Sequence, residues 1–476
     1  MKELEGYLNE GKDIVDLTGY KRENWTIEDL IQLIRDNPNV TILKLADTDI
    51  SCEDLQLLIQ SGALNDITEL DLSNNQLAYG DMSVIPFNKQ LLSKLTVLNL
   101  RNNCMENDDV EVIVDSNLAQ QFTKLDLSGN EIGNEGAEYI AKADFENLTW
   151  LNLASNSIGE GCTAILTYSG LSNLEVLDLS FNAITDQAME DIKEYYNTHY
   201  GLLDRLQELY IGANSITAEG VINLVNIDDC FENLHTLSFY NADCEDEFIG
   251  DEGVEAIVNS EKFPNLTHLS FAAQGITDTG AEYIAESENL ENLKVLDIQG
   301  NNIHDEGMRD IITSENLPEL EELHFNGNSF LSLSVVMDVY KWGADKGIEI
   351  FFDSNVDTLL KAIYNETLSL MDIIFQLCEV EVKIKDECTE DKKVVEPGIK
   401  YAQHILDHPE QYPLDINDKD SQGHLFNDLY TKYPNLHMWL ETRFPDHTFP
   451  YGDHTALDRQ LSAELLGSTI SDGAEH

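Results

Sequence analysis

The chain is poor in basic residues. Of its 476 residues only 28 are Lys or Arg, against 89 Asp or Glu, and the formal net charge is -61. Binding to nucleic acid depends on basic side chains that neutralise phosphates, so we expect no nucleic-acid partner. The acidity has three interpretations: it attracts a basic protein, it keeps the protein soluble, or it adapts the protein to salt, which the many Ile, Asn and Tyr residues do not support.

Long apolar segments are also missing. No stretch approaches the roughly 18 uninterrupted apolar residues that a membrane-spanning helix needs. The first residues, MKELEGYLNEGKDIVD, contain no apolar core of a secretory signal. We therefore expect a cytoplasmic protein without membrane insertion.

The residue patterns of metal, redox and hydrolytic chemistry are absent as well. The seven cysteines form no C-x-x-C pair, which favours free thiols packed in the core. No phosphate-binding G-x-x-x-x-G-K-[S/T] loop and no G-x-S-x-G motif occurs. His404 and His408 lie four apart on an expected helix, but no third metal ligand accompanies them. The sequence thus predicts no metal, no cofactor and no catalytic residue, and favours a non-enzymatic protein.

What the chain does contain is a repeat. Eleven copies of the pattern L-x-x-L-x-L-x-x-N-x-I follow one another between Val40 and Phe330, with equivalent leucines 26 to 32 residues apart. A fixed period of this length predicts a solenoid, whose activity lies on a long surface. The first strand leucines of the copies are Leu43, Leu70, Leu98, Leu125, Leu151, Leu177, Leu209, Leu237, Leu269, Leu296 and Leu323.

Each copy predicts one strand, one turn and one helix. Alternation of apolar residues places two side chains of the strand in the core and its neighbours on the opposite face. The Asn of the pattern is expected to bond to the buried backbone of adjacent turns. Three copies have Thr48, Ala242 or Gln274 at this position, so we expect an imperfect Asn ladder there. A segment I-x-[D/E]-x-G then leads into a helix, as at Ile276–Gly280.

The consensus resembles the ribonuclease-inhibitor type of leucine-rich repeat, over roughly residues 14 to 352. The resemblance implies an α/β solenoid, a horseshoe with parallel strands on its concave face and helices on its convex face. We expect an N-terminal cap at 1–39 and the repeats at 40–353. A capping helix and charged linker are expected at 354–396, and a small α-helical C-terminal domain at 397–476.

Aromatic and polar side chains mark one part of the expected concave face. The middle copies place Trp150, Tyr210 and Tyr240 there, with Phe181 at a strand exit. Large aromatic side chains surrounded by acidic residues are typical of protein-binding hot spots. The alternative is that the strand edges turn some of these rings into packing. The full set of candidate binding residues is Trp150, Asp178, Phe181, Tyr210, Tyr240, Phe248, His268 and His324.

These observations favour a monomeric protein-interaction module that binds a basic protein on its concave face. The composition also resembles effectors that intracellular bacteria deliver into host cells without a conventional signal peptide. Two other functions stay open. Related activators of GTPases use polar residues of the repeat loops, and Arg101 is the concave-face arginine here. An enzyme with its catalytic centre in residues 397–467 is the other.

Overall fold

The computed structural model describes residues 4–351, except 76, 78–81, 197–198, 200–201, 229, 242–247, 329–330 and 332. The capping helix and linker expected at 354–396 lie outside the described residues, as does the helical domain expected at 397–476 with His404 and His408. The chain divides into two compact units, and the repeats with the last strand form the first.

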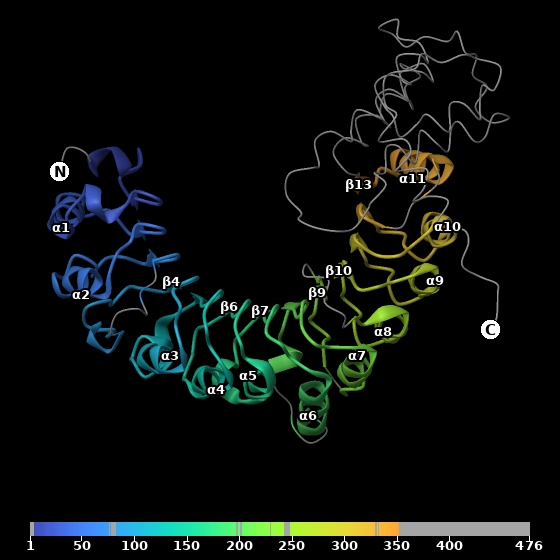
Figure 1. Ribbon diagram of the computed structural model, residues 1–476, viewed down its shortest axis with the longest axis horizontal. Coiled ribbons are helices and arrows are strands. Elements are labelled where there is room, and N and C mark those ends of the chain that lie inside the picture. The colour runs from blue at the N-terminus through green and yellow to red at the C-terminus, as the bar shows by residue number, and fades with distance from the viewer. Residues whose placement is uncertain are drawn as a thin grey trace, which may run out of the picture. The chain divides into compact units, whose positions relative to one another are not determined.

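The repeats form one parallel sheet in which thirteen strands lie side by side in chain order. Strands line the inner side of the curved repeat unit and helices its outer side (Figure 1). The prediction of an α/β solenoid with concave strands and convex helices is therefore confirmed. The strands are β1 (Ile14–Asp16), β2 (Ile42–Lys44), β3 (Glu69–Asp71), β4 (Val97–Asn99), β5 (Lys124–Asp126), β6 (Trp150–Asn152), β7 (Val176–Asp178), β8 (Glu208–Tyr210), β9 (Thr236–Ser238), β10 (His268–Ser270), β11 (Val295–Asp297), β12 (Glu322–His324) and β13 (Glu349–Phe351).

A helix follows most strands. Between β3 and β4 the described residues contain a short 3-10 turn, Met82–Val84, in place of an α-helix. The helices are α1 (Ile27–Asp36), α2 (Cys52–Gln60), α3 (Asn107–Val114), α4 (Asn134–Lys142), α5 (Cys162–Thr167), α6 (Asp186–Tyr196), α7 (Ala218–Val225), α8 (Gly250–Val258), α9 (Asp278–Glu286), α10 (Asp305–Thr313) and α11 (Leu333–Lys346).

The strand leucines form the core. Leu43, Leu151 and Leu237 are fully buried, and the other eight equivalent leucines are equally inaccessible. In β2 to β12 these leucines stand opposite one another in register, for example Leu151 beside Leu177. Their strand neighbours on either side are at least partly exposed. The alternation read from the sequence therefore gives the correct face for each residue of these strands.

Buried asparagines tie each repeat to the one before it. The side chain of Asn301 is 3% exposed. Its oxygen accepts from the backbone N–H groups of Gln274 and Ile276 at 2.9 and 3.0 Å. Its amide nitrogen donates to the carbonyls of Phe271 and Ile298, both at 2.9 Å. One side chain thus satisfies backbone groups of two successive turns.

The ladder is imperfect where Asn is replaced, as expected. The longer side chain of Gln274 donates to the carbonyl of Phe239 and accepts from the N–H of Ile249 at 3.2 Å, so this position keeps its link to the previous repeat. Gln274 does not make the bond to the strand carbonyl of its own repeat that Asn301 makes to Ile298. At the first copy, the hydroxyl of Thr48 donates to the carbonyl of Leu45, in its own repeat, at 2.8 Å. Ala242 lies outside the described residues.

Replacement of Asn301 by Ala should lower the free energy of unfolding by about 1–3 kcal/mol, because buried N–H and C=O groups would lose their partner. The measurement is urea unfolding followed by circular dichroism. Its neighbour Asn302 is exposed and offers a matched control. Equal stability of Asn301→Ala and Asn302→Ala would contradict the structural role of the ladder.

A second set of links joins the convex helices. The carboxylate of Asp251, at the start of α8, accepts from the N–H groups of Thr277 and Gly280 at the start of α9, at 2.8 and 3.0 Å. Asp278 caps α10 through His304 and Gly307 in the same way, and the links at α4 and α7 come from Asn107 and Asp186. A helix N-terminus with free N–H groups is thus completed by the preceding repeat.

This capping explains the glycine of the I-x-[D/E]-x-G segment. A Cβ atom on Gly280 would lie 2.5 Å from Oδ1 of Asp251, and one on Gly307 would lie 2.8 Å from Oδ1 of Asp278. Any larger residue would push the capping carboxylate away. The first two helices cap themselves instead, through Thr26 and Ser51.

Replacement of Asp251 by Ala should reduce stability by about 0.5–2 kcal/mol, the usual cost of losing a cap. Asp251→Asn should retain most of the stability, since Asn107 performs the same role at α4. Glu252→Ala is the control, because it removes an acidic residue from the same first turn of α8 without touching the cap. If Asp251→Ala and Glu252→Ala lower the thermal unfolding temperature equally, the loss comes from the helix dipole and not from the cap.

Two more ladders run along the edge where the strands begin. The hydroxyl groups of Thr68, Thr96, Thr123 and Thr149 each donate to the backbone carbonyl of the equivalent residue in the previous repeat, at 3.1 to 3.3 Å. Exposed asparagines one residue before a core leucine donate to another backbone carbonyl of the previous repeat, for example Asn173 to Glu146 at 2.7 Å. The signal in the sequence was a recurrent N-L pair, as at 173–174 and 233–234.

Candidate functional site

Four aromatic residues gather on neighbouring strands of the concave face. Trp150 begins β6, Phe181 lies just beyond β7, Tyr210 ends β8 and Tyr240 lies just beyond β9. Tyr240 is 42% exposed, and the other three are partly exposed. We call these four residues the aromatic surface.

The strand register fixes how these residues are arranged. Trp150 stands beside Val176, which stands beside Glu208; in the next row Asn152, Asp178 and Tyr210 lie side by side. Neighbouring strands lie about 5 Å apart. The aromatic surface therefore spans β6 to β9, with its rings distributed from the start of β6 to the turns beyond β7 and β9.

Tyr210 is held in place by its own strand. Its hydroxyl donates to Oε2 of Glu208 at 2.8 Å. The pKa of Tyr210 is raised, mainly by burial and secondly by this hydrogen bond, so the phenol stays protonated at neutral pH. The ring is thus fixed in an orientation on the concave face, which lowers the entropy cost of using it in binding.

Phe181 has an unusual backbone. Its φ is +58°, in the left-handed region, where a bulky residue is an outlier and costs on the order of 1–3 kcal/mol. The conformation itself belongs to the repeat, and the fully buried Phe231 also has a left-handed φ of +67°, so the strain does not by itself mark Phe181 as a binding residue. In the other repeats the left-handed residue of this turn is small or is Asn or Asp: Asp47, Asn74, Asn102, Gly129, Ser155, Ala213, Ala273, Gly300 and Gly327.

One further aromatic residue, Phe248, extends the surface toward β10. Phe248 is 36% exposed and lies over Gly275, where an added Cβ would come within 3.3 Å of the ring. The backbone of Tyr240 lies against Gly212, where an added Cβ would be 2.0 Å from its carbonyl oxygen. Glycine at 212 is thus required by the close approach of this strand exit.

Asp178 has a structural role that the sequence did not predict. Its Oδ1 accepts from the backbone N–H of Ser180 at 2.9 Å. The same bond to the residue two positions on recurs at Asp71, Asn99, Asp126, Asn152 and Asp297. The alternation of Asp and Asn at this position was the signal, since both offer the oxygen. Burial raises the pKa of the Asp178 carboxyl, although the Ser180 bond and the charge of Arg101 act against it.

The two candidate histidines lie apart from the aromatic surface. His268 is exposed in β10, with Nδ1 2.8 Å from the hydroxyl of Thr267. His324 in β12 stacks on Phe351, with ring centroids 4.0 Å apart, and its Nε2 lies 3.5 Å from Oε2 of Glu322. The structure therefore gathers Trp150, Asp178, Phe181, Tyr210 and Tyr240 together and leaves His324 in a separate cluster.

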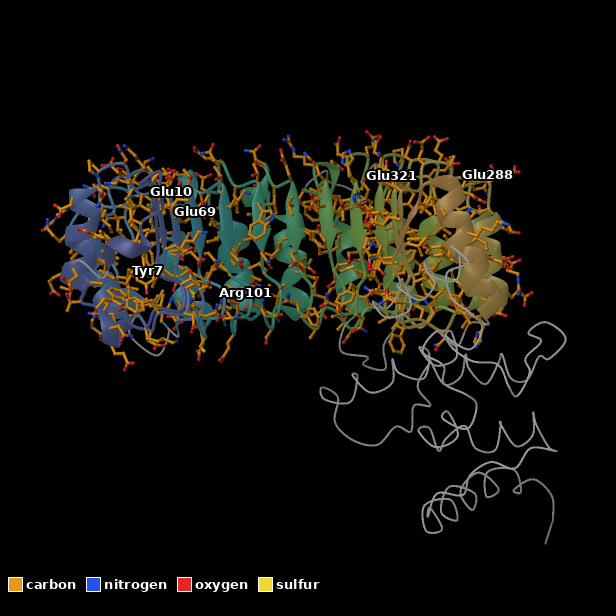
Figure 2. All side chains as sticks on the ribbon, turned by 90° about the horizontal axis from the view of Figure 1, so that it is seen from above. Tyr7, Glu10, Glu69, Arg101, Glu288 and Glu321 are labelled. Carbon is orange, nitrogen blue, oxygen red and sulfur yellow. The ribbon has the colours of Figure 1, made fainter. Side chains whose placement is uncertain are left out.

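Charge divides the concave face. The side chains that face inward from β2 to β5 include Lys44, Arg101 and Lys124. From β6 to β13 the equivalent positions hold five acidic residues and no Lys or Arg: Asp178, Glu208, Asp297, Glu322 and Glu349. Figure 2, which looks onto this face, shows Glu69 near the edge where strands begin and Arg101 near the edge where they end. The aromatic surface thus belongs to the half without basic residues.

The edge where strands begin carries two shallow hollows. One of about 430 Å³ is lined by residues that include Asn147, Asn173 and Arg205, and one of about 540 Å³ by residues that include Asn265 and Lys294. Figure 2 places Glu288 and Glu321 along the same edge. Small-molecule sites are mostly apolar and enclosed, so these open polar hollows do not resemble one.

The described part of the chain contains no group of three or more His, Cys, Asp and Glu side chains that could hold a metal ion. Within the same residues, no helix has the length and apolar character to cross a membrane.

Four segments of the chain, 92–114, 120–141, 170–193 and 289–311, match the family model described as Leucine Rich repeat. Among solved structures, an internalin (inlF) from Listeria monocytogenes is 18% identical and the match covers 74% of this chain and 82% of that one, with a TM-score of 0.44. A TLR13–ssRNA13 complex is 19% identical over 62% of this chain and 44% of that one, with a TM-score of 0.36. No curated protein matches the chain. These four segments, whose strand leucines stand in register in the core, are leucine-rich repeats.

Proposed function

We propose that this chain is a non-enzymatic module that captures a basic protein partner on the concave face, over the aromatic surface. The observation that carries the proposal is the set of aromatic rings that stay at least partly exposed on the acidic half of the concave face, namely Trp150, Phe181, Tyr210 and Tyr240. Rigid rings that face solvent in a row contribute little to folding but can dominate a binding interface. The acidic half of the concave face supplies the complementary charge.

Two finer parts of the proposal come from the sequence. The α-helices on the convex side suit the ribonuclease-inhibitor type of repeat, which we propose for this chain. We also propose that the protein acts as a monomeric bacterial effector in the host cytoplasm, because its composition resembles such effectors. The partner should therefore be sought among host proteins.

The first test is capture of a partner from a host-cell lysate on the immobilised full chain, followed by mass spectrometry and affinity measurement with the purified partner. Replacement of Trp150 and Tyr210 by Ala should weaken binding about 30-fold or more, since truncating a hot spot costs about 2 kcal/mol and ~1.4 kcal/mol corresponds to tenfold. Circular dichroism should show an unchanged fold.

The matched control removes exposed apolar side chains outside the strands. Tyr168, directly after α5, is 44% exposed and Ile222 on α7 is 41% exposed. Replacing both by Ala should change the affinity less than twofold. Loss of binding in this control, with full binding by the Trp150 and Tyr210 variant, would move the interface off the concave face.

The acidity gives a second test. Between about 0.01 M and about 0.15 M ionic strength the Debye length falls from ~30 Å to ~8 Å. If charge steers a basic partner, the association rate measured by stopped flow should fall at least about tenfold over this range. A rate that does not change with salt would assign the charge to solubility alone.

The capture also separates the alternative functions. If the partner is a GTPase, Arg101→Ala should be assayed for the rate of GTP hydrolysis, because Arg101 is the exposed arginine of the concave face. A large fall in hydrolysis with unchanged binding would replace the capture function by enzyme regulation.

A further inference from the structure

We infer that the concave face binds one Lys or Arg side chain of the partner at Asp178, with the rings of Trp150 and Tyr210 on either side of the bound cation. The cation site, as we call it, consists of Trp150, Val176, Asp178, Glu208 and Tyr210. The inference rests on the proposed function and specifies the chemistry that the partner must present.

The strand register builds this site. β7 lies between β6 and β8, and its Val176 and Asp178 face the same side, about 7 Å apart along the strand. Trp150 stands beside Val176 on one flank, and Tyr210 stands beside Asp178 on the other. The two rings therefore lie on opposite sides of β7. A cation on β7 between two aromatic rings and above a carboxylate gains both cation–π and Coulomb attraction.

Charge points to an external cation. Glu208 accepts the hydroxyl of Tyr210 at 2.8 Å and so brings a second carboxylate into the same site. No Lys or Arg occupies an inward-facing position of β6 to β13. Arg101, beyond β4, acts on Asp178 only through its charge. Lys124 on β5 stands beside Trp150, but within the described residues no salt bridge joins Asp178 or Glu208 to a Lys or Arg. Two partly buried carboxylates without an ion pair favour a partner that supplies the base.

Asp297 shows what distinguishes the cation site from the rest of its row. Asp297 occupies the same position on β11 and is also partly buried. Its strand neighbours are Ser270 and His324, and its Oδ2 already accepts from the Ser270 hydroxyl at 3.1 Å and from Gln299 Nε2 at 3.2 Å. Asp297 therefore has internal donors and no Trp or Tyr on adjacent strands, which makes it a matched control.

The test uses the full chain with 15N-labelled tryptophan and the peptide acetyl-Ala-Arg-Ala-amide as probe, at about 0.15 M ionic strength to screen non-specific attraction. The chain has four tryptophans, so the indole N–H of Trp150 gives one of four NMR signals and is assigned by its absence in Trp150→Phe. The control probe replaces Arg by citrulline, which has the same shape and no charge.

Asp178→Asn is the critical variant. It should fold normally, because Asn99 and Asn152 occupy the same position and make the same bond to the residue two positions on. We expect a saturable shift of the Trp150 signal with the Arg peptide. The dissociation constant should rise about fivefold or more in Asp178→Asn and with the citrulline peptide, equivalent to about 1 kcal/mol, and less than twofold in Asp297→Asn.

Three results would overturn the inference: no saturable shift, equal affinity for the citrulline peptide, or equal effects of Asp178→Asn and Asp297→Asn. The proposed function fails separately. If Asp178→Asn leaves the affinity for the captured partner within twofold while loss of Trp150 and Tyr210 abolishes it, the interface stands and the cation site does not. If neither variant affects the partner but the Arg peptide still binds at Asp178, the cation site stands and the interface lies elsewhere.

Discussion

The structure depends on one constraint: the turn after each three-residue strand buries backbone N–H and C=O groups that its own repeat cannot pair. An amide side chain from the next repeat satisfies them, as Asn301 does for the turn at Gln274 and Ile276. Because the unpaired alternative would cost about 1–3 kcal/mol per group, the spacing between repeats has little freedom. The strand register, and with it the row to which each inward-facing residue belongs, follows from that fixed spacing.

Much of this could be predicted from the sequence, because strand register is a local property. The Leu-x-Leu alternation assigned the buried face correctly, and it placed Trp150 and Tyr210 on the two strands that flank β7. The caps between helices could not be predicted in the same way, since the bond from Thr277 to Asp251 joins residues 26 positions apart. The left-handed turn at Phe181 follows from its place in the repeat, where other copies have Gly, Asn, Asp or a small residue, but Phe by itself gives no sign of it because Phe normally avoids this conformation.

The concave face combines two kinds of surface. Its N-terminal half mixes acidic and basic side chains and can satisfy its own charges, whereas the half from β6 onward has acids and aromatic rings without bases. Asp178 belongs to both the framework and the surface, because one oxygen holds the turn at Ser180 while the carboxylate faces solvent. A substitution at this position keeps the turn only if it keeps the oxygen that accepts this bond. Asn does so at positions 99 and 152.

The caps and the ladders point in opposite directions along the chain. A carboxylate of one repeat completes the helix of the following repeat, as Asp251 does for α9, whereas an amide of the following repeat completes the turn before it. During synthesis on a ribosome, each emerging helix would therefore find its cap already folded, while the newest turn would wait for one more repeat. During growth from the N-terminus, only the backbone groups of the newest turn thus lack their amide partner, and this holds whatever the number of repeats already made.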